Sequence, residues 1–314
     1  MNHFSEVLNQ GKRKEGEVIQ QLTSEAAKAS GEQKGKMDWA DEQKKRRDSL
    51  FEMIDAACHT VVSSPQTMSE FLVVQSRFEK YSLNNNILIY AQKPNATKIK
   101  DFNGWKNEGG SVKKGSKGFM ILEPMPYIKN GEQRTTFKVK TVFDVADVAD
   151  APPIPPVSFD SAMLIRALVH DCPVDIKTVP NYPTDKPDGA YFDVEDKCIY
   201  AKAGMSVNDI FTSVSQAIAC AEFARNTNGQ FRVSDHEFQA RCVAYALAQK
   251  YGVSSGKVNL YSMPARYASY DSEQIKKELS EIHGVIKAIT GRMNEVLLER
   301  PGGKNQNRNA REAR

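Results

Sequence analysis

The feature that most constrains the fold of this chain is a proline-rich stretch near its middle, with four prolines within five residues: Pro152, Pro153, Pro155 and Pro156. Each proline fixes its own φ angle and lacks an amide hydrogen. Such a stretch therefore favours an extended polyproline II conformation over a packed helix or strand. We predict a linker at residues 151–157 that separates one domain, residues 46–150, from another, residues 158–298.

Both ends of the chain are polar. Residues 1–45 mix acidic and basic side chains with few large apolar ones, which predicts a disordered or marginally helical arm. Residues 299–314 carry five arginines and lysines, and we expect them to form a basic, disordered tail.

Composition argues against two classes of protein. The sequence contains no run of about 18 apolar residues, so we expect no transmembrane helix. Its five cysteines are an odd number and none belongs to a Cys-x-x-Cys pair. A disulfide framework is therefore not expected, and a cytoplasmic location fits better. The formal net charge of +4 is too small to identify a partner.

Apolar periodicity predicts both helices and strands, and hence an α/β or α+β fold. In the first domain we expect helices and then a small antiparallel sheet whose strands meet at an Asn-Gly hairpin turn. The second domain is predicted to be mostly helical, with one β-hairpin. The predicted helices lie within residues 38–64, 65–82, 83–94, 162–172, 207–226, 234–253 and 272–297, and the strands within 111–128, 135–148 and 189–204.

Residues 71–124 concentrate the positive charge. This segment has nine basic and four acidic residues, an excess of +5. Aromatic residues, amides and glycines are interleaved with the lysines. Lysines can neutralise phosphates and aromatic faces can stack on bases, so the mixture suits a single-stranded nucleic acid. The alternative is that the aromatics form a core and the lysines a solvated face.

The same segment resembles a known family. The pieces "F-x-x-YS-x-N-N-N-x-L-I-YAQ-x-P-x-AT", then "W", then "G-x-x-V-x-K-G-x-KG" occur in order from Phe78 to Gly118. They are similar to the N-terminal domain of ArdC-type antirestriction proteins, in the LtrC-like branch found on mobile elements of Gram-positive bacteria. The resemblance implies an α/β domain that binds single-stranded DNA.

The resemblance also implies a set of contacts to DNA. Lysine side chains would bind phosphates, aromatic rings would stack on bases, and amides would make polar contacts. Two alternatives remain open: a buried Trp105, and an Asn85 that hydrogen-bonds the domain's own backbone. The predicted contacts are Lys106, Lys113, Lys114 and Lys117 for phosphates, Tyr81 and Trp105 for stacking, and Asn84 and Asn85 for polar contacts.

In this family a zincin-like metallopeptidase domain usually follows, with His-Glu-x-x-His on a helix. Here "QAIAC" aligns with that motif, so Gln216 and Cys220 take the two histidine positions and Ala217 takes that of the general base. Glu237 remains as a possible third ligand. Glutamine is a poor zinc ligand and alanine cannot transfer a proton. We therefore expect no catalytic residue, metal or cofactor in this domain. A nucleophilic pair formed by Cys220 and His236 is a further alternative, which only the types of these two residues support.

The resemblance implies a DNA-binding protein of a mobile element that protects incoming single-stranded DNA against restriction, with an inactive zincin-like domain. Its expected partners are single-stranded DNA and a host restriction or defence protein, with no membrane. Two alternatives remain: a metallopeptidase or nuclease with an atypical site, and a protein-binding inhibitor of a host defence enzyme. The sequence does not give the oligomeric state.

Overall fold

The computed structural model describes residues 41–153, 159–225, 227, 231–256 and 258–298. These residues form two compact units. The smaller unit has residues 41–51 and 123–139, and the larger has 52–122 and 140–298. Most of the predicted arm, most of the predicted linker and the whole predicted basic tail lie outside the described residues. Helices and small sheets occur together, which confirms the predicted mixed α/β fold.

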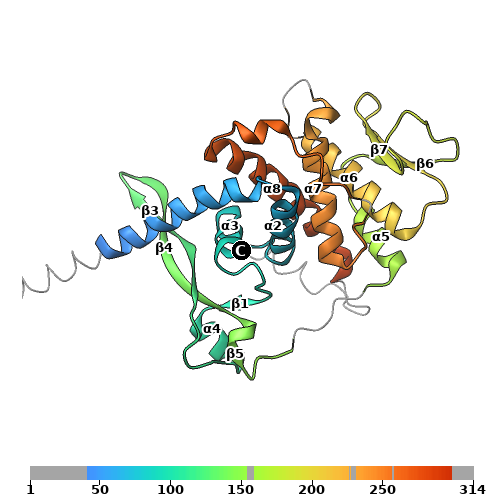
Figure 1. The fold of residues 1–314 in the computed structure, drawn as a ribbon. Coiled ribbons are helices and arrows are strands. Elements are labelled where there is room, and N and C mark those ends of the chain that lie inside the picture. The colour runs from blue at the N-terminus through green and yellow to red at the C-terminus, as the bar shows by residue number, and fades with distance from the viewer. Residues whose placement is uncertain (1–40, 154–158, 226, 228–230, 257, 299–314) are drawn as a thin grey trace, which may run out of the picture. The chain divides into compact units, whose positions relative to one another are not determined.

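The smaller unit holds the outer part of a β-hairpin. Strands β3 (Phe119–Lys129) and β4 (Glu132–Asp144) pair with each other along this hairpin (Figure 1). Asn130 and Gly131 connect them with positive φ angles of 54° and 79°, which is the turn that an Asn-Gly pair favours. Phe137 of β4 meets Phe51 edge to face, with ring centroids 6.0 Å apart. The predicted hairpin is therefore confirmed.

The first part of the larger unit begins with helices. A helix whose described part covers residues 41–61 runs into it, followed by α2 (Pro65–Arg77) and α3 (Leu83–Gln92). Ser64 caps α2 through a reciprocal hydrogen-bond pair with Thr67, and Pro65 occupies the first helical turn. The helices expected within 38–64, 65–82 and 83–94 are confirmed.

Short elements follow α3. β1 (Ile99–Lys100) pairs antiparallel with the end of β4, so the first sheet has the order β1-β4-β3. Helix α4 (Phe102–Asn107) was not predicted. It forms because the Asp101 side chain accepts a hydrogen bond from the Gly104 amide at 2.6 Å. β2 (Ser111–Val112) then pairs with β5 (Val148–Ala149), just after the short helix η1 (Val145–Asp147).

Two amide side chains of α3 bind the free edge of β3. Asn85 Nδ2 donates to the Leu122 carbonyl at 2.8 Å, and Asn85 Oδ1 accepts from the Leu122 amide at 2.8 Å. Gln92 does the same for Met120, at 2.8 Å and 3.0 Å. The helix therefore supplies the hydrogen bonds that a neighbouring strand would give, and satisfies an otherwise unpaired sheet edge. We call these four bonds the amide clamp.

The second part of the larger unit has one sheet and long helices. In that sheet, of order β6-β8-β7, the unpredicted β6 runs parallel to β8 and β7 runs antiparallel to it, which confirms the hairpin at 189–204. Helices α6 and α7 pack together (Figure 1). The elements are α5 (Ser161–Val169), β6 (Asp175–Val179), β7 (Ala190–Asp193), β8 (Cys198–Lys202), α6 (Val207–Arg225), α7 (Val233–Tyr251), η2 (Ala265–Ala268) and α8 (Ser272–Leu297).

Helices from both sides of the proline-rich stretch pack within the larger unit. α2 contacts α7, and α3 contacts α8. Polar contacts link the same region: Lys250 of α7 pairs with Glu79, just after α2, at 3.0 Å, and His283 Nδ1 of α8 lies 3.1 Å from the Gln75 amide nitrogen of α2. The predicted domain boundaries remain predictions, but residues 52–122 and the later helices share one core. In the part of the chain that the structure describes, no helix is both long and apolar enough to span a bilayer.

The amide clamp predicts opposite outcomes for two adjacent asparagines. Asn85→Ala would leave the buried Leu122 amide and carbonyl unpaired, so it should lower the free energy of unfolding by about 2 to 4 kcal/mol. Asn84 is only half-buried, and Asn84→Ala should change that free energy by no more than about 0.5 kcal/mol. Urea unfolding of the two variants beside the wild type measures both values. Equal losses would contradict the clamp.

Candidate nucleic-acid interface

Three of the four predicted phosphate contacts lie on a turn between β2 and β3, residues 113–118, which we call the lysine loop. The Lys113 amide donates to the Asp147 carbonyl at 2.9 Å, and the Ser116 amide donates to the Lys113 carbonyl at 3.1 Å. Gly115 has a φ of +86°, which glycine adopts readily. At Gly118, a Cβ would lie 2.5 Å from Thr141 Cγ2 and 2.9 Å from the Val142 carbonyl, so only glycine fits where the loop enters β3.

The loop's ammonium groups face solvent. Lys113, Lys114 and Lys117 are all exposed. Lys113 Nζ donates to the Ala146 carbonyl at 2.9 Å, which holds the side chain in place without cancelling its charge. Among the residues that the structure describes, no acidic side chain forms an ion pair with any of these three lysines. Their charge is therefore available to an anionic ligand.

Helix α4 adds a cation and an aromatic ring beside the loop. It packs against β2, the strand that leads into the lysine loop. Lys106 is exposed, and Phe102, one helical turn earlier, is 56% exposed. Residues four apart share one face of a helix, so the ring and the ammonium group lie together. Phe102 was not among the predicted contacts, because helix α4 was not predicted. Both aromatic residues lie on this helix, which buries Trp105 and leaves Phe102 exposed.

Two of the predicted contacts are buried instead. The Trp105 side chain has no exposed surface, and its Nε1 donates to the Phe143 carbonyl at 2.9 Å. No ring face is free to stack on a base. Asn85 is also buried and engages both of its amide atoms in the clamp. For both residues the structure shows the alternative role, which is to support the domain's own fold.

A network of ion pairs lies beside α4. Glu108 pairs with Lys98 at 2.9 Å and with Lys100 at 2.8 Å, and these two lysines hold the pKa of its carboxyl below the usual range. Lys140 pairs with Asp101 at 2.9 Å and lowers the pKa of Asp101 in the same way. The three lysines of this network thus share two carboxylates. They are weaker candidates for phosphate binding than the lysines of the loop.

Tyr81 and Asn84 lie on the other side of this network. The Tyr81 ring is half-buried against Phe78, with centroids 5.8 Å apart. Burial raises the pKa of Tyr81, while Lys100 and Lys140 act in the opposite direction, so its hydroxyl lies near their ammonium groups. Asn84 is half-buried at the start of α3 and lines a groove beside α8. The structure therefore places the predicted contacts in two groups, joined by the ion-pair network.

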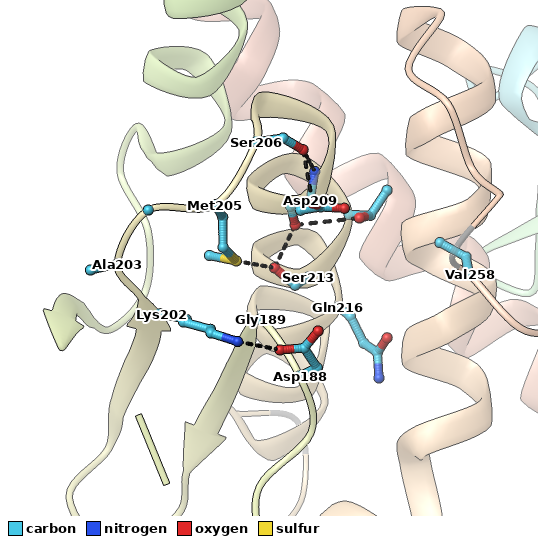
Figure 2. Close-up of a pocket in the computed structure, with 12 residues that line it drawn as sticks. Asp188, Gly189, Lys202, Ala203, Met205, Ser206, Asp209, Ser213, Gln216 and Val258 are labelled. Carbon is cyan, nitrogen blue, oxygen red and sulfur yellow. Dashed lines mark hydrogen bonds and ion pairs between the residues drawn. The ribbon is translucent and has the colours of Figure 1, made fainter. Parts of the chain in front are cut away.

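The positions aligned with a zinc site lie on α6 and α7. Gln216 lines a pocket of about 280 Å³ whose wall includes the Lys202–Asp188 ion pair at 3.0 Å and Ser213, which donates to the Asp209 carbonyl at 2.6 Å (Figure 2). The lining also includes Ser206, Asp209 and Thr212, which bear hydroxyl and carboxylate groups. Within the described ranges, no three histidine, cysteine, aspartate or glutamate side chains are grouped as a metal site would require.

Cys220 and Glu237 do not form an obvious ligand pair. Cys220 is buried, and burial, followed by the Glu237 carboxylate, raises the pKa of its thiol to about 12. A thiol in this state is neither a good nucleophile nor a ready metal ligand. Glu237 faces the guanidinium group of Arg241 at 3.9 Å, which places a positive charge near the aligned site. His236 lies against Phe223 and Phe231, with ring centroids 5.4 Å and 4.9 Å apart.

Comparison with known proteins identifies the first part of the chain. Residues 40–147 match the family described as the N-terminal domain of anti-restriction factor ArdC. The chain is also 24% identical over 304 residues to the uncharacterized protein pXO2-81 of Bacillus anthracis, in an alignment covering 78% of this chain and 51% of that protein. It therefore spans about half the length of this curated relative.

Two crystal structures of the antirestriction ArdC protein from the R388 plasmid also match. The metal-free structure has a TM-score of 0.46 and 16% identity, and the alignment covers 68% of this chain and 86% of that chain. The Mn(II)-bound structure has a TM-score of 0.47 and 15% identity, with 73% and 97% coverage. The family match over residues 40–147 confirms the predicted resemblance there. The zincin-like character of residues 158–298 stays a prediction.

Proposed function

We propose that this ArdC-like protein binds single-stranded DNA, because residues 40–147 match the N-terminal domain of the ArdC antirestriction family. The observation that carries the proposal is the group of exposed lysines without carboxylate partners on the lysine loop and α4, next to the exposed ring of Phe102. Lysines bind phosphates wherever they occur along a strand, and a free ring stacks on any unpaired base.

An unpaired strand suits this surface better than a duplex or a free nucleotide. Bases in a duplex hide their faces from an aromatic ring, whereas a single strand offers them. A free nucleotide would need a phosphate cradle, and the chain contains neither the P-loop pattern nor the dinucleotide fingerprint. No base-reading pattern of side chains supports a sequence preference. We therefore propose binding with little dependence on sequence.

The biological role we propose is protection of a mobile element's DNA while it is single-stranded in a new host. A protein that coats the strand would delay attack by restriction enzymes. The support is the family of residues 40–147 together with the exposed cationic surface. Fold similarity alone does not fix function, so the role of the whole protein rests on this proposal.

A second candidate is a protein-binding inhibitor of a host restriction or defence enzyme. One observation favours it: Met125, Tyr127 and Ile128 on β3 are 46%, 41% and 79% exposed. Exposed apolar side chains clustered on a hairpin are a common feature of protein-binding surfaces. This candidate predicts that removing the three side chains abolishes inhibition while DNA affinity is unchanged.

The lysine loop predicts the salt dependence of DNA binding. For single strands the logarithm of the affinity falls with the logarithm of salt concentration with a slope of about −0.7 per phosphate neutralised. The triple change Lys113→Ala, Lys114→Ala and Lys117→Ala should make the slope shallower by about 2, since three contacts are lost. Fluorescence anisotropy of a labelled oligonucleotide over a salt series measures it.

The matched control is the triple change of three exposed lysines in and around the β6-β8-β7 sheet, Lys177→Ala, Lys186→Ala and Lys197→Ala. It removes the same charge from the whole protein and should leave the slope unchanged. If the loop variant keeps the wild-type salt slope, or if the slope of the control variant becomes equally shallow, the lysine loop is not the binding site.

For the aligned zinc positions we propose that no peptidase or nuclease activity resides there. Gln216 is a weak ligand, Ala217 offers no base, and the Cys220 thiol stays protonated near neutral pH because its pKa is raised. We expect purified protein to contain much less than one zinc per chain and to leave casein intact. One zinc per chain in elemental analysis, or casein cleavage that a chelator stops, would favour the enzyme alternative.

A further inference from the structure

A groove joins the start of α3 to the exposed side of α8. It is lined by Ser82, Leu83 and Asn84 on one side and by Glu273, Lys276, Lys277 and Ser280 on the other, and its volume is about 440 Å³. The first side belongs to the segment that matches the ArdC family, whereas α8 lies more than a hundred residues beyond the end of that match. Asn84, a contact predicted from the sequence, therefore faces residues of the second part of the chain.

The exposed side of α8 continues beyond this groove. Lys277, Ser280, Gly284 and Lys287 are spaced by three, four and three residues, which places them along one face of a helix. All four are exposed. A Cβ built on Gly284 would meet nothing within 4 Å, so the helix backbone is open to close approach there. This face offers two long cations separated by small residues.

Charges of both signs occur along this face. Lys276 pairs with Asp55 at 2.8 Å and also bonds Glu273, so its one ammonium group is shared by two carboxylates at the groove. Neither Lys277 nor Lys287 has an ion-pair partner among the residues that the structure describes. Glu281, one turn after Lys277, is the opposing charge. Lys277 and Lys287 are therefore the cationic groups that remain available to a phosphate on this face.

This face is continuous with Tyr81 and the ion-pair network. Ser82, at the groove, directly follows Tyr81, whose hydroxyl lies near Lys100 and Lys140 of the ion-pair network. At the other end, His283 of α8 bonds Gln75 of α2 and lies close to both the Tyr81 backbone and Lys287. The surface therefore runs from the lysine loop past the network and Tyr81 to α8. No separate domain has to move for one strand to reach both ends.

We propose that this face of α8 is a second subsite for the same DNA strand, in which Lys277 and Lys287 bind phosphates of its backbone and Ser280 and Gly284 allow close approach. The inference rests on the proposed function, because it extends that site. It assigns to α8, outside the ArdC-family segment, part of the DNA interface. The chemical class recognised is the phosphodiester backbone of an unpaired polynucleotide.

The test uses the full chain and fluorescein-labelled oligothymidylate of about 20 nucleotides, longer than the ~16-nucleotide upper range of many single-strand sites. Lys277→Ala combined with Lys287→Ala should make the salt slope shallower by about 1.4, since each lysine contributes about 0.7. Ser280→Lys should make it steeper by about 0.7 for the same reason. Because the second variant gains binding, misfolding cannot imitate its effect. Lys177→Ala on β6 is the control and should not change the slope.

The outcomes separate the two proposals. A slope that responds as stated to both α8 variants supports the subsite. Wild-type slopes in both α8 variants, with a shallower slope in the lysine-loop triple variant, would overturn the α8 subsite and leave the proposed function standing. A wild-type protein that does not bind the oligothymidylate at all would overturn both.

Discussion

The amide clamp is the interaction on which the candidate site depends. Asn85 and Gln92 bind the backbone of Leu122 and Met120, so α3 and β3 have a fixed position relative to each other. The lysine loop leads directly into β3, while Tyr81 and Asn84 lie at the start of α3. Four hydrogen bonds, two of them buried and two part-buried, thus hold the two groups of predicted contacts in one arrangement. Losing one amide would leave buried backbone groups unpaired, which costs more than the bonds contribute when they are intact.

Electrostatics then decides which lysines can bind a ligand. Lys98, Lys100 and Lys140 are held by Glu108 and Asp101, whereas the lysines of the loop have no such partners within the described ranges. Exposed ion pairs contribute little to stability, but they reduce the charge available to a phosphate. The nine basic residues counted from the sequence are therefore not equivalent. Among them, Lys93, Lys98 and Lys100 are held in ion pairs, whereas the lysines of the loop and α4 are exposed.

The sequence predicted much of the fold and only part of the candidate site. Helical periodicity located α2, α3, α6, α7 and α8, and the Asn-Gly pair located the hairpin turn, because these signals are local. Trp105 and Asn85 were selected as DNA contacts because an indole and an amide can serve a ligand as well as a core. Their roles follow from the Phe143 carbonyl and the Leu122 backbone, partners 38 and 37 residues away. Local sequence could not reveal these partners. Likewise, nothing in the amphipathic pattern of α8 indicated that it would line a groove with Asn84.

The measurement that tests the central claim most directly compares one labelled oligonucleotide as a single strand and as a duplex, each titrated with wild-type protein at a low and a high salt concentration. We expect the single strand to bind more tightly than the duplex at both concentrations, because only unpaired bases expose faces to Phe102 and Tyr81. We also expect its affinity to fall at the higher concentration, because phosphates release counterions on binding. No binding of the single strand at low salt, or tighter binding of the duplex, would contradict this account.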